Sequence, residues 1–245
     1  MLKRIFHSFL TFFLPRKLRM FISWAWYEGV QRVLWPDKWE RRRLELLVGP
    51  CEAWEPHQRF MFDFILKEGL KPEHYLIDLG CGPLSVGLAL IPYLEKGHYF
   101  GVDIRESAIA EAYRQVAKAG LAKMNPSLIV SSTFGAEELG DLAVDYVLAS
   151  AVIYHLLDEQ ADKCFIEVAK RLKDDGVFCC NVNTVVPESR WYEFPFVCRS
   201  IDFYKALGER YGLVMKAVKK LSELGYPESL PAKSNHMLEF RKIRQ

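Results

Sequence analysis

The order of apolar and polar positions divides the chain into a helical first part and an alternating second part. From Asp37 to Gly69, apolar residues recur at helical spacing, and Gly69 is placed to end a helix. From Tyr75 onward, short continuous apolar runs alternate with longer amphipathic stretches. That alternation is typical of buried parallel strands joined by helices.

The alternating part predicts seven strands and the helices that connect them. The expected strands are 75–78, 99–102, 128–130, 144–149, 177–182, 213–221 and 237–243. The expected helices are 84–94, 107–119 with Ser107 as its cap, 158–172 and 201–207. Because the last two strands follow each other without a helix, we expect them to pair antiparallel. The prediction is an α/β fold: a doubly wound, seven-stranded, mostly parallel sheet with an antiparallel C-terminal hairpin, plus an N-terminal helical extension.

The formal net charge of +2 hides an uneven distribution of charge. Residues 1–43 carry ten Lys or Arg and three Asp or Glu, a net of +7, whereas residues 44–245 carry 23 and 28, a net of −5. We therefore predict a basic, aromatic-rich helical extension, residues 1–43, and a separate domain, residues 44–245. A helical segment, residues 44–70, leads into the first strand of that domain.

The first 35 residues combine basic side chains with Phe and Trp. Residues 5–14 resemble the apolar core of a signal peptide, but Pro15, Arg16 and Lys17 follow where small residues would mark a cleavage site. No apolar run approaches the roughly 18 residues that span a bilayer. The pattern is typical of a helix on an anionic membrane surface; packing on the domain or on a second subunit is the alternative. The predicted location is cytoplasmic, peripheral on the inner face of a membrane.

The composition excludes several classes of protein. Half of the residues are hydrophobic and 26% are charged, which is typical of a folded globular chain and not of a disordered one. The six cysteines include no CxxC pair, so we predict neither a disulfide framework nor a metal site. Buried free thiols in a reducing compartment are the expectation.

Glycines follow the first predicted strand in the run DLGCGP, residues 78–83. They allow a sharp turn and the close approach of a ligand, and the start of the next helix offers free N–H groups. Asp103, after the second strand, is placed to bind the hydroxyls of a ribose. The predicted ligand is a nucleoside cofactor. A dinucleotide fits less well, because Ser85 occupies the third glycine position of the G-x-G-x-x-G pattern.

Four motifs in chain order carry a family resemblance. They read YLIDLGCGP (residues 75–83), YFGVDI (99–104), VDYVLASAVIYHL (144–156) and LKDDGVFCCNVN (172–183). With them the chain resembles the class I S-adenosylmethionine-dependent methyltransferases, which implies their Rossmann-like fold and S-adenosyl-L-methionine as the cofactor. The run FDFILKEGLKP, residues 62–72, resembles a subgroup associated with methylation of bacterial cell-surface glycans and related small molecules.

The resemblance implies roles for individual residues. The residues expected to bind the cofactor are Asp78, Gly80, Cys81, Gly82, Pro83, Asp103, Ile104, Gly135, Ala136 and Ser150. Asp78 and the glycines would line the methionine end, Asp103 would hold the ribose, and Ile104 would touch the adenine. Gly135 stands where an acidic adenine contact is common, so the backbone or a neighbour would read the adenine amine. Ser150 would face both the cofactor and the substrate.

Candidates for catalysis and substrate binding follow the fourth and fifth strands. His155 is a candidate general base for a hydroxyl or an amine, with a structural role in holding the loop as the alternative. Tyr154 would line the site beside it. The candidate substrate residues, in an aromatic lid, are Arg190, Trp191 and Tyr192; a hydrophobic plug or an oligomer contact is the alternative. His57 and Gln58, before the first strand, are further candidates.

The predicted activity is methyl transfer to an oxygen or nitrogen nucleophile of a small molecule, a glycan or a lipid-linked acceptor. The sulfonium of the cofactor is already a good electrophile, so the protein mainly supplies alignment. The alternatives are an RNA or protein methyltransferase and a non-catalytic partner protein with the same fold. The acidic domain argues against a nucleic acid. The sequence leaves the oligomeric state open.

Overall fold

The computed structural model describes residues 29, 31–34, 36–48, 54–185, 187–191, 194–227 and 236–242. The chain divides into two compact units, residues 1–51 and residues 52–245. In the first unit, the described residues form α3 (Gln31–Leu34) and α4 (Pro36–Val48), which confirms helices in the N-terminal extension. The predicted boundary after residue 43 falls inside α4.

The segment expected to bind a membrane surface is only partly covered, because residues 1–28 lie outside the described residues. The longest described helices, α5 (Trp54–Lys67) and α8 (Asp158–Arg171), have 14 residues each. No helix in the described part of the chain has the length and apolar character needed to cross a bilayer.

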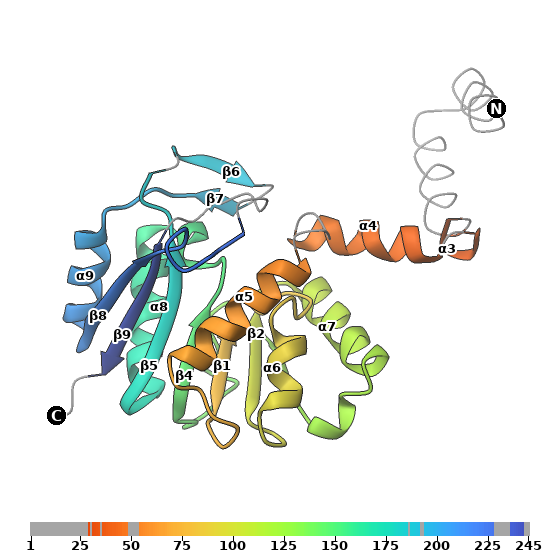
Figure 1. The fold of residues 1–245 in the computed structure, drawn as a ribbon, viewed down its shortest axis with the longest axis horizontal. Coiled ribbons are helices and arrows are strands. Elements are labelled where there is room, and N and C mark those ends of the chain that lie inside the picture. The colour runs from red at the N-terminus through yellow and green to blue at the C-terminus, as the bar shows by residue number, and fades with distance from the viewer. Residues whose placement is uncertain are drawn as a thin grey trace. The chain divides into compact units, whose positions relative to one another are not determined.

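The second unit contains the predicted sheet (Figure 1). Its strands are β1 (Leu76–Leu79), β2 (Tyr99–Asp103), β3 (Ser127–Val130), β4 (Val144–Ala149), β5 (Leu172–Val182), β8 (Leu213–Lys220) and β9 (His236–Lys242). They lie in the order β3-β2-β1-β4-β5-β9-β8. Strands β1 to β5 pair in parallel, and β9 pairs antiparallel with both β5 and β8. The fold prediction, with its antiparallel C-terminal hairpin, is confirmed.

Helices cover both faces of this sheet. Besides α5 and α8 they are α6 (Gly87–Tyr93), α7 (Glu106–Lys118) and α9 (Ile201–Arg210), with short 3-10 turns η3 (Ala122–Met124) and η4 (Ile153–His155). Apolar residues of α5, α6 and α7 share one buried cluster with the sheet, and those of α8 and α9 share another. A small second sheet pairs β6 (Ser189–Trp191) with β7 (Phe194–Phe196).

Two helices begin at other residues than predicted. α6 begins at Gly87, because residues 82–86 form the turn that follows β1. α7 begins at Glu106, so Ser107 lies inside the helix and the predicted Ser107 cap is wrong. The side chain of Asp103 supplies the bond at this end instead, because its Oδ1 accepts the Arg105 N–H at 2.9 Å. An acidic residue at the end of β2 therefore also organises the start of the next helix.

The alternation of side chains along β1 places an acidic residue in an apolar layer. Leu76 packs in the cluster with α5, α6 and α7, whereas Ile77 and Leu79 pack in the cluster with α8 and α9. Because successive side chains of a strand point to opposite faces, Asp78 points to the same face as Leu76. Asp78 is only 2% exposed there.

The described cysteines are free thiols, as predicted. Four of them are buried, namely Cys81, Cys164, Cys179 and Cys180, and Cys198 is partly exposed. Cys51 lies outside the described residues. Burial raises the pKa of the Cys164 thiol to about 12, so this side chain packs as a neutral, apolar group.

Candidate functional site

The loop after β1 is fastened to the end of β2 by three backbone N–H groups. The N–H groups of Gly80 and Cys81 donate to the Val102 carbonyl at 2.7 and 3.1 Å. The N–H of Gly82 donates to Asp103 Oδ2 at 3.0 Å. The loop lies where the sheet order changes direction, between β1 and β4, which is where open α/β sheets bind ligands.

Glycine is favoured at both turns of this loop. Gly80 and Gly82 have φ values of +67° and +53°, a region that other residues rarely adopt. A Cβ atom at Gly80 would also lie 2.3 Å from Cγ2 of Val152, beyond the end of β4. Cys81 is buried between the two glycines, and burial raises the pKa of its thiol. Pro83, which follows, is buried as well.

The end of β2 offers a buried carboxylate next to an exposed apolar side chain. Asp103 is 5% exposed and accepts hydrogen bonds from the Gly82 N–H and from the backbone and Nε of Arg105. Ile104 is 54% exposed. A carboxylate suits the hydroxyls of a ribose, and an exposed aliphatic side chain suits the flat face of a base. The two residues present here therefore fit a nucleoside.

Asp78, expected to line the methionine end, accepts a hydrogen bond inside the apolar layer. Its Oδ2 accepts the Tyr99 hydroxyl at 2.7 Å. Burial raises the pKa of Asp78 to about 7; the Tyr99 bond opposes this rise, and the nearby charge of Asp103 adds to it. Near neutral pH, the residue therefore exchanges between a carboxylic acid and a carboxylate.

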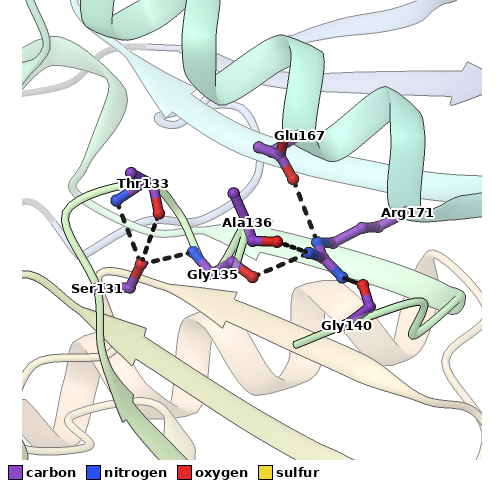
Figure 2. A network of polar contacts seen from close by, with 7 residues as sticks. All are labelled: Ser131, Thr133, Gly135, Ala136, Gly140, Glu167 and Arg171. Atoms are coloured by element: carbon purple, nitrogen blue, oxygen red, sulfur yellow. Dashed lines mark hydrogen bonds and ion pairs between the residues drawn. The ribbon is translucent and has the colours of Figure 1, made fainter. Parts of the chain in front are cut away.

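The loop after β3 is held by a buried arginine that reaches across from α8, as Figure 2 shows. The Arg171 guanidinium donates to the carbonyls of Gly135 and Gly140 at 2.9 Å each and to that of Ala136 at 3.1 Å. Within the loop itself, Ser131 Oγ accepts the Gly135 N–H at 3.0 Å. Gly135 and Ala136, both predicted cofactor residues, are thus fixed from two directions. Glu167, one turn before Arg171, lies 3.5 Å from its Nε.

A histidine of α5 links three distant segments. His57 Nε2 lies 3.0 Å from Ser150 Oγ, just after β4, and His57 Nδ1 lies 3.0 Å from the Tyr226 hydroxyl, after β8. Burial lowers the pKa of His57 to about 4, so its imidazole is neutral at physiological pH. The adjacent Gln58 donates to the Ser85 carbonyl at 2.8 Å. The start of α5 therefore contacts both the end of β4 and the loop after β1.

The two candidate catalytic residues of η4 hold the β6–β7 hairpin. His155 Nδ1 donates to the Pro195 carbonyl at 2.7 Å, and the Tyr154 carbonyl accepts the Val197 N–H at 2.8 Å. The Tyr154 ring packs edge-on against Phe196, with the ring centroids 5.1 Å apart. Burial raises the pKa of Tyr154, which keeps its phenol protonated. These contacts match the alternative in which His155 holds the loop.

The predicted substrate residues belong to the same hairpin. Arg190 and Trp191 lie in β6, and Tyr192 lies outside the described residues. The hairpin also reaches the end of β2, because the Arg105 guanidinium lies 5.6 Å from the centroid of the Phe194 ring. It therefore lies over the ligand-binding edge of the sheet, where the sequence predicts a lid. Among the described residues, no three His, Cys, Asp or Glu side chains are grouped closely enough to hold a metal ion.

Three residues that support the ligand-binding edge were not predicted from the sequence: Arg171, Tyr226 and Arg105. Arg171 does carry a signal, because it continues the spacing of the buried residues Ala161, Cys164, Phe165 and Val168 on α8. A charged residue on an apolar helix face marks a buried polar contact. Tyr226 carries no such signal, since only the folded chain brings it beside His57.

The fold and the glycine loop together define a doubly wound α/β protein whose ligand-binding edge carries residues that fit a nucleoside. Comparison with known families narrows this class: a family model described as a methyltransferase domain matches residues 77–178. A probable methyltransferase of Aspergillus luteorubrus is 28% identical over 61 residues, which is 25% of this chain and 21% of that protein. The chain therefore matches only about a fifth of the length of this curated relative.

Two solved structures with a similar fold are named as methyltransferases. An S-adenosylmethionine-dependent methyltransferase from Clostridium acetobutylicum is 14% identical, with a TM-score of 0.59 over 77% of this chain and 92% of that one. Magnesium protoporphyrin IX methyltransferase from Synechocystis, solved with bound S-adenosylmethionine, is 15% identical, with a TM-score of 0.61 over 89% and 97%. The matched domain and the fold support a class I methyltransferase. They also support the predicted cofactor, S-adenosylmethionine.

Replacing Arg171 with lysine should loosen the loop after β3. A single ammonium cannot reproduce the fork that binds three carbonyls, and a hydrogen bond to a charged group is worth about 1.5–3 kcal/mol. We expect Arg171→Lys to lower the free energy of unfolding by about 2 kcal/mol or more and to weaken binding of S-adenosylmethionine. Urea unfolding and calorimetry measure the two effects. The control is Lys170→Gln, an exposed neighbour on α8; equal behaviour of the two variants would contradict the assignment.

The raised pKa of Asp78 predicts a loss of stability as pH rises. The unfolded chain releases this proton near pH 4 and the folded chain near pH 7, so between these values the folded state binds more protons. The free energy of unfolding should therefore fall across this window, by about 1–3 kcal/mol from this group. Asp78→Asn keeps an acceptor for Tyr99 and should lose the effect, whereas the exposed Asp141→Asn should keep it. Urea titrations at about pH 4.5 and about pH 7.5 test this; the same slope in Asp78→Asn would refute it.

Proposed function

We propose that this protein is an enzyme that transfers a methyl group from S-adenosyl-L-methionine to an oxygen or nitrogen nucleophile. The observation that carries the proposal is the closed loop at Gly80 and Gly82, fastened to Asp103 beside the exposed Ile104. A nucleoside bound here would meet a buried carboxylate, an exposed apolar side chain and a loop backbone that it can approach closely. All three lie where the strand order of the sheet changes direction.

The acceptor we propose is a small molecule, a glycan or a lipid-linked compound. The similar Synechocystis protein is named for a small-molecule acceptor, which favours this class. The resemblance of residues 62–72 to a subgroup linked to glycans adds cell-surface sugars to the candidates. The net charge of −5 on residues 44–245 disfavours a polyanion such as RNA.

Bound S-adenosylmethionine would supply an electrophilic methyl group. In our proposal, Asp103 orients the ribose, and the backbone of the loop after β1 lies against the methionine end beside Asp78. Gly135 and Ala136, held by Arg171, form the wall at the adenine end. Ser150, after β4, faces the reacting methyl group. The β6–β7 hairpin closes the edge and keeps water out, so alignment is the main catalytic contribution of the chain.

Removal of the Asp103 charge tests the cofactor site. A hydrogen bond to a charged group is worth about 1.5–3 kcal/mol, so Asp103→Asn should weaken binding of S-adenosylmethionine by about tenfold or more. Calorimetry on the wild type, Asp103→Asn and the exposed control Glu106→Gln measures the change, with NADH as the comparison ligand. A wild type that prefers NADH, or an unchanged affinity in Asp103→Asn, would refute the assignment.

The basic extension, residues 1–35, is proposed to bring the enzyme to an anionic membrane surface. Lys and Arg beside Phe and Trp suit such a surface, each basic residue adding about 1 kcal/mol. The full chain should sediment with vesicles that contain an anionic lipid, but not with zwitterionic vesicles, and deletion of residues 1–35 should abolish this. Salt-sensitive RNA binding that the same deletion removes would instead favour the RNA alternative.

A further inference from the structure

The strongest unassigned feature is the hydrogen-bonded chain from Ser150 through His57 to Tyr226. Both distances are 3.0 Å, and the three residues lie 93 and 169 positions apart in the sequence. These three hydrogen-bonded residues also lie next to the proposed cofactor loop. Val152, two residues after Ser150, contacts Gly80, and Gln58, next to His57, binds the loop at Ser85.

The imidazole must accept on one nitrogen and donate on the other. Burial keeps His57 neutral, so its ring carries one N–H and one lone pair. Both neighbours are hydroxyls, which either donate or accept. Burial raises the pKa of Tyr226 to about 12, so this residue stays a phenol. With Nδ1–H donating to the Tyr226 oxygen, His57 Nε2 presents its lone pair to the Ser150 hydroxyl.

Docking of α5 does not account for this arrangement. The helix is already anchored by Met61, Phe64 and Ile65, which are 0–4% exposed, and by the bond from Gln58. An apolar side chain at position 57 would dock the helix without the cost of burying a polar ring. The Tyr226 ring is itself held edge-on by Phe60, with centroids 4.9 Å apart, which fixes the hydroxyl against His57.

We infer that Ser150, His57 and Tyr226 form a proton relay for an acceptor hydroxyl, so that the group methylated is an oxygen. This inference rests on the proposed methyl transfer and narrows its acceptor. The acceptor hydroxyl donates its proton to Ser150 Oγ, and the Ser150 proton moves to His57 Nε2. The acceptor oxygen forms its bond to the methyl carbon as the carbon–sulfur bond breaks, and that electron pair stays on sulfur as a neutral thioether. The imidazolium donates to Tyr226 and later releases the proton to water.

The relay makes His57 a transient base, because burial keeps the ring neutral except while it passes the proton on. A merely structural role would involve no proton uptake. His57→Gln keeps a donor and an acceptor for the two hydroxyls but takes up no proton at neutral pH. His57→Ala leaves room for an added imidazole. Ser150→Ala breaks the relay while leaving His57 in place. The matched control is His74→Ala, a histidine before β1 at the opposite end of that strand.

The experiment uses S-adenosylmethionine labelled on its methyl group, with membrane and soluble extracts of the source organism as the acceptor pool. Calorimetry with S-adenosylmethionine and thermal unfolding accompany each variant. We expect the wild type and His74→Ala to form an O-methyl product, located by mass spectrometry. His57→Gln, His57→Ala and Ser150→Ala should transfer about 100-fold more slowly or worse, and the two His57 variants should keep cofactor affinity within about threefold. Free imidazole should restore part of the His57→Ala rate.

The outcomes separate this inference from the proposed function. Label on nitrogen or sulfur, a full rate in His57→Gln, or no imidazole rescue of a folded His57→Ala would overturn the relay and leave the methyltransferase proposal standing. A wild type that binds S-adenosylmethionine but labels nothing in either extract would overturn the proposed function and the relay with it. If His57→Ala fails to fold, Ser150→Ala and His57→Gln still decide the question.

Discussion

The attachment of the glycine loop to the end of β2 is the constraint on which the ligand-binding edge depends. One carbonyl, that of Val102, accepts two loop N–H groups, and the next side chain, Asp103, accepts a third. The same carboxylate binds the Arg105 backbone and so sets the start of α7. Asp103 thus connects the loop after β1, the end of β2 and the start of α7, and it lies at the ligand-binding edge of the sheet. The Asp103 carboxylate oxygens that stabilise the loop are also the atoms proposed to bind a ribose.

The fold and the cofactor loop could be predicted because their signals are local. Continuous apolar runs indicated every strand of the main sheet. The run DLGCGP marked the turn after β1, since glycine adopts a positive φ without strain and, at position 80, leaves room for Val152. The start of α7 was misplaced for a different reason. A serine near a helix start resembles a cap, but Asp103, three residues before the helix, already satisfies the backbone there.

The pairing of the polar residues that support the site could not be predicted, because the partners are distant in sequence, although His57 and Ser150 were each candidate site residues. Arg171 binds carbonyls 31 to 36 positions away, and His57 meets Ser150 and Tyr226 across 93 and 169 positions. Propensity and periodicity describe neighbours along the chain and carry no information on such pairs. His155 shows the converse: its place after β4 suggested chemistry, but in the fold it bonds the hairpin at Pro195.

The position of β9 has a consequence for how the protein is made. β8 precedes β9 along the chain, yet within the main sheet β8 pairs with β9 alone, and β9 pairs with β5. During synthesis β8 therefore emerges with no strand to join, and it remains an unpaired edge until residues 236–242 insert between it and β5. Met237, Leu238 and Phe240 of β9 are at most 1% exposed in the finished sheet. The apolar surface that β9 covers stays exposed until that step, so this half of the domain closes last and is the half most exposed to aggregation while it folds.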